Sequence, residues 1–185
     1  MESYFRELSE KLCAGLPGGE VLLLNYRGED SDFVRLNHNR IRQAGHVRQQ
    51  SLQLDLIHRG RETSASLPLS GRLDDDLAEA AGVLGRLREQ LPWLPEDPHL
   101  NYATEVHNSS HHGDNRLPAA GDALEQLIDA AHDLDLVGVW AGGGMDHGFA
   151  NSLGQFNWHS AHSFNLDWSI YREGDKAVKQ NYAGF

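Results

Sequence analysis

The sequence has one cysteine and no long apolar run. Because Cys13 stands alone, the chain cannot build an internal disulfide framework, and such cysteine usage is typical of a reducing compartment. No apolar stretch approaches the roughly 20 residues that a helix needs to span a bilayer. Residues 1–7 lack the basic region and apolar stretch of a secretory signal. We therefore predict a soluble, cytoplasmic protein without a membrane segment.

Basic residues are scarce relative to acidic ones. The chain has 16 Lys and Arg against 27 Asp and Glu, which gives a net charge of −11 at pH 7. Nucleic-acid binding depends on neutralising phosphates, so this charge opposes it and we do not expect nucleic acid as a partner. Hydrophobic residues make up 39% and charged residues 23%, values that predict a folded core. The length of 185 residues fits one domain, residues 1–185.

The first part of the chain, residues 1–72, reads as a helix followed by strands. Phe5, Leu8 and Leu12 recur at helical spacing and predict an amphipathic helix over residues 2–14. Compact or alternating apolar segments predict strands near 21–26, 33–37, 40–48, 51–58 and 61–68, with a turn at 29–32. This close spacing favours an antiparallel meander, because parallel strands need crossover connections of a dozen or more residues.

The periodicity changes at Leu73, where a helical part, residues 73–135, begins. We predict a helix of 18–20 residues from Leu73, a polar loop with histidines over 99–117, and a second helix over 119–134. Residues 136–185 return to strands, near 137–140, 147–151, 156–171 and 176–182. Because no helix follows Gly142-Gly143-Gly144, these glycines predict a hairpin link and not a phosphate-binding loop. The expected fold class is α+β: antiparallel meander sheets with two longer helices packed on them.

One segment, Gly148 to Gln155, carries a family signature. Its Asn151-Ser152-Leu153-Gly154 resembles the Asn-Ser-x-Gly motif of the TldD/PmbA (TldE) family, once named for modulating DNA gyrase. The segment from Phe33 to Gln43 resembles the family's early strand pair, and the order of the helices agrees. The similarity follows nearly the whole chain in order.

This resemblance implies the amino-terminal, non-catalytic domain of a zinc metallopeptidase. The family's catalytic part lies further on and carries a His-Glu-x-x-x-His helix that binds zinc together with a cysteine. That motif is absent here, so no catalytic residue is carried over and no cofactor is expected in this chain; zinc is implied for the full-length TldD-type enzyme. The domain would shape the substrate channel and the dimer, with a peptide substrate or a second subunit as partner. The strand-like end of the chain, residues 180–185, also indicates a fragment or a short homologue.

Two readings of another class stay open. One is a stand-alone binding or regulatory module, such as a catalytically inactive partner or a DNA gyrase modulator. The other is an independent metalloenzyme that uses the chain's 11 histidines.

The histidines offer weak metal candidates. His159 and His162 have metal-ligand spacing, but in a strand, residues three apart point to opposite faces. His107 and His111 would share a face if their segment were helical, and Asp114 could add an oxygen ligand. This segment is polar and follows a proline cluster, so a solvated loop without metal is the default interpretation.

Two groups of residues are candidates for binding: a stripe of basic side chains, and residues of the Asn-Ser-x-Gly motif. A stripe of six basic side chains comprises Arg35, His38, Arg40, Arg42, His46 and Arg48. On a strand, Arg40 and Arg42 would project together, where they could receive an acidic partner or a peptide carboxylate. The alternative is the solvated face of a hairpin. From the resemblance, Asn151, Ser152 and Gly154 are added as a signature strand and turn.

Overall fold

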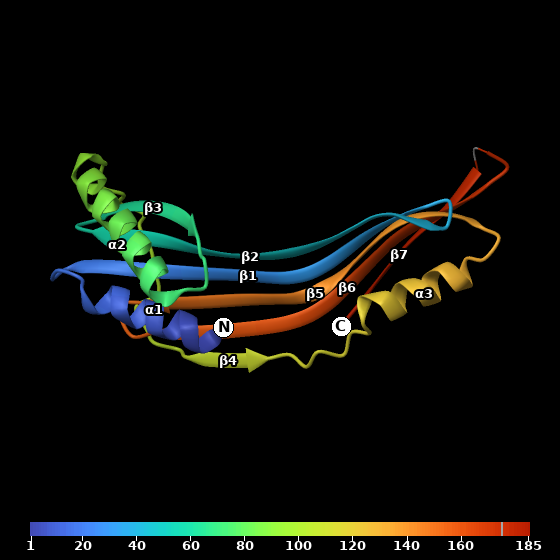
Figure 1. The fold of residues 1–185 in the computed structure, drawn as a ribbon. Helices are drawn as coiled ribbons and strands as arrows, with labels where there is room; N and C mark the ends of the chain where they lie inside the picture. Colours follow the sequence, from blue (N-terminus) through green and yellow to red (C-terminus); the bar gives the residue numbers. More distant parts are fainter. Residues whose placement is uncertain (175) are drawn as a thin grey trace. The chain divides into compact units, whose positions relative to one another are not determined.

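The computed structural model describes residues 1–174 and 176–185 (Figure 1). Its helices are α1 (Glu2–Ala14), α2 (Leu73–Gln90) and α3 (Ala120–Ala130), with a 3-10 turn at Leu91–Trp93. The strands are β1 (Glu20–Asn37), β2 (Arg40–His58), β3 (Arg61–Pro68), β4 (Ser109–His112), β5 (Asp135–Asn151), β6 (Phe156–Arg172) and β7 (Lys176–Gly184). The predicted helices at 2–14 and from Leu73 are confirmed, while the predicted helix at 119–134 ends earlier, at Ala130.

The strands form one sheet in the order β3-β2-β1-β5-β6-β4, and β7 also pairs with β6. Strands β2 and β3 pair antiparallel with Leu54 opposite Ala65, and β6 and β7 pair antiparallel with Asp167 opposite Asn181. A two-residue turn joins β1 to β2, and its residues His38 and Asn39 both have positive φ, 49° and 52°. Such a turn matches the twist of an antiparallel pair. The predicted α+β class is confirmed.

The chain packs as two compact units. Unit 1 consists of Met1–Gly28, Gln49–His112 and Asp146–His159, and unit 2 consists of Glu29–Arg48, Gly113–Met145 and Ser160–Phe185. Strands β1, β2, β5 and β6 therefore contribute residues to both units. The predicted single domain over 1–185, with parts at 1–72, 73–135 and 136–185, stays a prediction.

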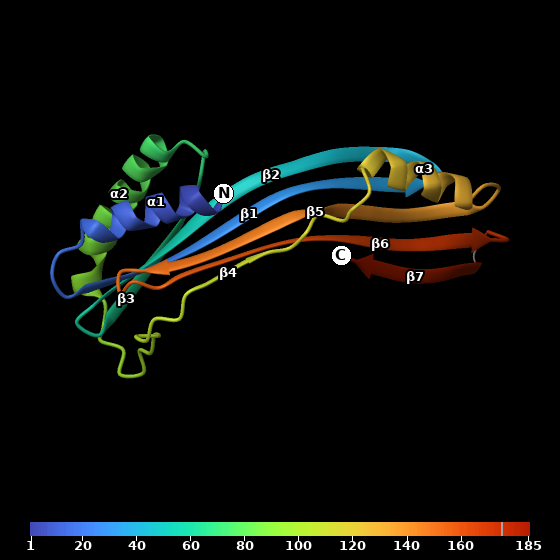
Figure 2. The same ribbon diagram turned by 90° about the horizontal axis from the view of Figure 1, so that it is seen from below.

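Helices α1 and α2 cover the sheet of unit 1 (Figure 2). The apolar stripe of α1 is buried, with Phe5 and Leu8 fully inaccessible, and it meets an aromatic pair from the strands. The Phe5 ring lies 5.4 Å from the ring of Tyr26 and 6.3 Å from that of Trp158. Burying each such side chain stabilises the fold by roughly 1.5–3 kcal/mol, so this cluster anchors the helix to the sheet.

Helix α3 covers the sheet of unit 2 on one face. Its Leu124 packs with Val34 and Leu36 of β1 and with Trp140 of β5. The turn between β1 and β2 is fixed to the same helix, because the Asn39 side-chain amide donates to the Ile128 carbonyl across 2.9 Å. The position of this hairpin is therefore set by the core of unit 2.

The structure corrects four expectations about turns and loops. Strand β1 continues through the predicted turn at 29–32, and β2 continues without a break from Arg40 to His58. Strand β5 passes through Gly142-Gly143-Gly144, which is therefore not a hairpin link. The predicted loop over 99–117 contains the short strand β4.

A packing requirement explains the glycines of β5. A Cβ atom on Gly143 would lie only 2.3 Å from the Asp30 carbonyl oxygen and 2.4 Å from the Ser31 Cα of the neighbouring strand. Only glycine allows this close backbone approach. The acidic residues of β1 are also accommodated in the strand, because His46 lies within ion-pair distance of Asp30 and Asp32.

Among the described residues, no helix combines the length and the apolar character needed to cross a membrane.

Candidate functional site

The sheet of unit 2 carries a hollow of about 600 Å³. Arg35 and Asn37 of β1, Arg42 of β2, Val137 and Val139 of β5, and Lys179 of β7 line it. Side chains of a strand alternate between faces, so Arg35 and Asn37 point away from the face on which Val34 and Leu36 meet α3. The side chains that face α3 form the core, and the charged side chains of the hollow come from the alternate positions.

The lining of this hollow is positive. Lys179 forms an ion pair with Asp167, with 3.5 Å between the Lys179 amine nitrogen and the Asp167 carboxylate oxygen. Within the described part of the chain, Arg35 and Arg42 have no ion-pair partner, and both are exposed. The two arginines come from neighbouring strands, which lie about 4.8 Å apart in a sheet. Their guanidinium groups can therefore approach one ligand together.

The other members of the predicted basic stripe are arranged differently. His38 pairs with Asp135 at 2.8 Å, His46 with Asp32 at 2.9 Å, and Arg48 with Asp30 at 3.7 Å. Arg40 is exposed next to the turn and is not among the residues that line the hollow. The sequence analysis paired Arg42 with Arg40, whereas in the structure Arg42 lines the hollow together with Arg35, another member of the predicted stripe. The predicted role of Arg40 and Arg42 in binding stays a prediction.

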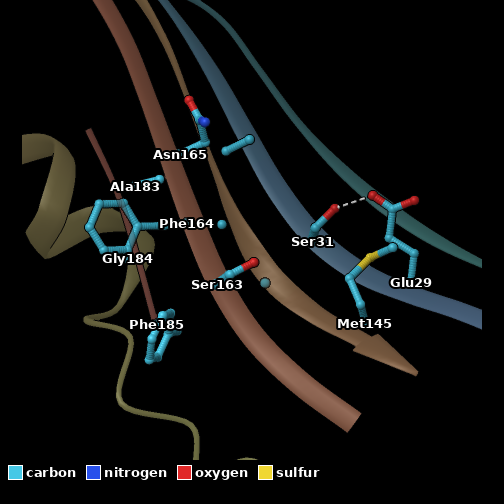
Figure 3. Close-up of a pocket in the computed structure, with 12 residues that line it drawn as sticks. Glu29, Ser31, Met145, Ser163, Phe164, Asn165, Ala183, Gly184 and Phe185 are labelled. Carbon is cyan, nitrogen blue, oxygen red and sulfur yellow. Dashed lines mark hydrogen bonds between the residues drawn. The ribbon is translucent and has the colours of Figure 1, made fainter. Parts of the chain in front are cut away.

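Unit 2 carries a second hollow, of about 430 Å³ (Figure 3). It lies over the glycines of β5, with Phe164 and Phe185 on one side and Ser31, Glu29 and Met145 on the other. The Ser31 hydroxyl donates a hydrogen bond to the Glu29 carboxylate across 2.6 Å, so these two polar groups of the lining bond to each other. The absence of side chains at Gly142 and Gly143 leaves this surface open. No sequence motif marked it.

The signature residues form the turn between β5 and β6 in unit 1. The Asn151 side-chain oxygen accepts hydrogen bonds from the backbone N–H groups of Leu153 and Gln155, each across 3.0 Å. The Ser152 hydroxyl accepts from the Leu22 N–H across 3.1 Å, and the Ser152 N–H donates to the Leu22 carbonyl. Gly154 has φ +101°, which favours glycine. These groups hold the turn; their predicted role in binding stays a prediction.

The histidine candidates lie on strands and loops. His111 belongs to β4, and its ring stacks on that of His159 at 4.9 Å. His107 precedes β4, its Nε2 lying 3.4 Å from a Glu105 carboxylate oxygen, and Asp114 is exposed after the strand. The helical arrangement that would have joined His107 and His111 is not formed. Strand β4 gave no signal in the sequence, so its contact with His159 was missed.

The donor set of this chain does not fit the zinc that the resemblance implies for the full-length enzyme. In the parts of the chain that the structure describes, no three His, Cys, Asp or Glu side chains lie together in a way that could hold a metal. Burial raises the pKa of the Cys13 thiol to about 11, which disfavours the thiolate that a metal requires. We assign no chemical step to a metal here.

Two sequence comparisons give no match: no family model matches the chain, and neither does any curated protein. Comparison with solved structures, by contrast, places the fold in a definite class. It is the α+β fold of proteins described as DNA gyrase modulators and as TldE.

Three solved structures match almost the whole chain. A proposed modulator of a DNA gyrase from Thermotoga maritima matches 98% of it with a TM-score of 0.64 and 9% identity. One from Bacteroides thetaiotaomicron matches 98% with a TM-score of 0.61 and 13% identity. TldE from Thermococcus kodakarensis matches 97% with a TM-score of 0.62 and 15% identity. The sequence resemblance to the TldD/PmbA family is thereby confirmed at the level of the fold.

The chain spans less than half the length of these proteins. It covers 42% of the Thermotoga protein, 43% of the Bacteroides protein and 42% of TldE. The fold therefore corresponds to part of a TldD/TldE-type protein.

Proposed function

We propose that this chain is the amino-terminal, non-catalytic domain of a TldD/TldE-type peptidase, and that it shapes the peptide channel and the contact between subunits. The fold match over 97–98% of the chain is the observation that carries this proposal. The lack of a three-ligand cluster among the described residues supports a non-catalytic role for this part of the protein. Hydrolysis would then be supplied by a zinc-bearing domain or subunit elsewhere, in the cytoplasm.

The surface of unit 2 suits such a role. One face of its sheet packs against α3, and charged side chains at the alternate positions line the 600 Å³ hollow, which could contact an extended chain. A non-catalytic domain contributes to proteolysis by binding and positioning, and an open sheet face offers both. The stand-alone regulatory module remains the competing hypothesis.

Reconstitution with a TldD-type partner tests the proposal. We expect the full chain alone to leave an unstructured peptide intact, and we expect it to form a complex with a TldD-type subunit and increase that subunit's rate of cleavage. Cleavage products are followed by mass spectrometry, and complex formation by sizing with light scattering. Failure to associate or to change the rate favours the regulatory module. Stoichiometric zinc that survives dialysis of the chain alone would contradict the non-catalytic assignment.

A further inference from the structure

We propose that Arg35 and Arg42 form a carboxylate-binding site that takes an acidic side chain of an extended peptide. The two residues line the same hollow from the neighbouring strands β1 and β2. A planar guanidinium matches a carboxylate with two parallel hydrogen bonds, and two guanidiniums from adjacent strands can enclose one carboxylate. The choice of a peptide as ligand rests on the proposed function; the choice of a carboxylate rests on the site.

Charge and position together select this arginine pair. The chain has a net charge of −11, and three basic residues of the hairpin stripe, His38, His46 and Arg48, lie against aspartates. Arg40 has no ion-pair partner among the described residues, but it does not line the hollow. Arg35 and Arg42 keep their positive charge without an ion-pair partner among the described residues. Two cations without an ion-pair partner in one hollow of an acidic protein attract an anionic ligand.

The geometry of the sheet sets the length of the ligand. From β2 the strand order runs through β1, β5 and β6 to β7, which is four strand spacings and therefore about 19 Å. An extended peptide advances about 3.3 Å per residue, so roughly six residues cross the hollow from the arginine pair to Lys179. Val137 and Val139 lie between, on β5, and offer apolar contact to the middle of the peptide. The expected ligand is therefore about six residues long, acidic at one end and apolar in the centre.

The lysine end of the hollow contributes less. Lys179 is already paired with Asp167, so a second acidic residue would have to compete with that carboxylate. We therefore expect recognition to depend on the acidic residue at the arginine end.

Fluorescence anisotropy with labelled hexapeptides tests this inference on the full chain. One peptide has glutamate at one end and valine and threonine in the centre, and its analogue has glutamine in place of glutamate. We expect the acidic peptide to bind about fivefold more tightly, as for a solvent-accessible ion pair of about 1 kcal/mol. Arg35→Gln and Arg42→Gln should each lower the acidic peptide's affinity toward that of the neutral one. Arg42→Lys should retain part of the preference.

Two further arginines serve as controls. Arg116→Gln changes an exposed arginine of unit 2 outside the hollow and should leave the preference unchanged. Arg40→Gln separates the hollow from the general charge of the hairpin and should have less than half the effect of Arg42→Gln. Equal affinity for the two peptides, or equal losses in the Arg40 and Arg42 variants, would overturn the inference. Neither result touches the proposed function, which the reconstitution with a TldD-type subunit tests separately.

Discussion

The Tyr4 hydroxyl of α1 donates a hydrogen bond to the Asp76 carboxylate of α2, which lies 72 residues away in the sequence. The same carboxylate accepts from the backbone N–H groups of Ser70 and Gly71, across 2.8 and 2.9 Å, and its side chain is buried. Asp76 therefore ties the start of α2 to α1 and to the segment after β3. Burial, followed by the Asp76 contact, raises the pKa of Tyr4, so the hydroxyl stays protonated and able to donate at physiological pH.

Removing the Tyr4 hydroxyl should destabilise unit 1. In Tyr4→Phe, the buried carboxylate loses one of its donors, and a hydrogen bond to a charged group contributes about 1.5 kcal/mol or more to the free energy of unfolding. Urea denaturation followed by circular dichroism measures the change. Tyr171→Phe removes a hydroxyl from an exposed side chain and should leave the midpoint unchanged. An equal midpoint for the wild type and Tyr4→Phe would show that the hydrogen bond contributes nothing.

Asp76 should also make stability depend on pH in the acid range. Burial alone would raise the pKa of its carboxyl group, but the hydrogen bonds from Tyr4, Ser70 and Gly71 outweigh burial and lower that pKa below its usual value. Because the folded-state pKa is lower than the unfolded one, of about 3.9, the stabilisation is fully present above pH 3.9. It is lost as the pH falls through the folded-state pKa.

A comparison of variants measures this loss of stability at acid pH. We expect Asp76→Asn to be less stable than the wild type at pH 7 and to lose less further stability on acidification. Thermal melts at pH 7, 4 and 3 give the comparison, and Asp74→Asn in the same helical turn is the exposed control. If the melting temperatures of the wild type and Asp76→Asn fell in parallel with pH, the pH dependence would not come from Asp76.

The close approach of β5 to β1 predicts an intolerant glycine. Alanine at Gly143 would place its Cβ 2.3 Å from the Asp30 carbonyl oxygen, a backbone atom that can move only with its strand. Overpacking of this kind costs about 1–3 kcal/mol, so Gly143→Ala should lower the melting temperature of the chain by several degrees. Gly85→Ala, in α2 where a Cβ meets no atom within 4 Å, should raise stability by up to about 1 kcal/mol.

These residues also show where the sequence was informative. Periodicity located α1 and α2 because apolar side chains at helical spacing, such as Phe5 and Leu8, are the ones that pack on the sheet. It failed at residues 29–32 and 142–144, where acidic residues and glycines are typical of turns. There the tertiary structure overrides local preference: the aspartates lie against His46 and Arg48 of the neighbouring strand, and the glycines permit close strand packing.

The candidate site was only partly predictable, for a related reason. Alternation along β2 marked Arg42 as a surface residue, but the hollow also needs Arg35 of β1, Val137 of β5 and Lys179 of β7. Which strands lie next to each other is a long-range property, and no local pattern encodes it. The contact between His111 and His159 was missed for the same reason.

The signature turn permits a test that separates structure from binding. The Ser152 hydroxyl accepts from the N–H of Leu22, a fully buried residue. In Ser152→Ala this N–H loses its partner, and an unsatisfied buried donor costs about 1–3 kcal/mol. We expect a lower urea midpoint and faster hydrogen exchange at the Leu22 amide. Leu153→Ala, at an exposed position of the same turn, should change neither. If Ser152→Ala is as stable as the wild type but binds peptide more weakly, the turn is a binding element. If the variant is less stable and its peptide affinity falls only in proportion to the folded fraction, Asn-Ser-x-Gly serves to hold β5, β6 and β1 together.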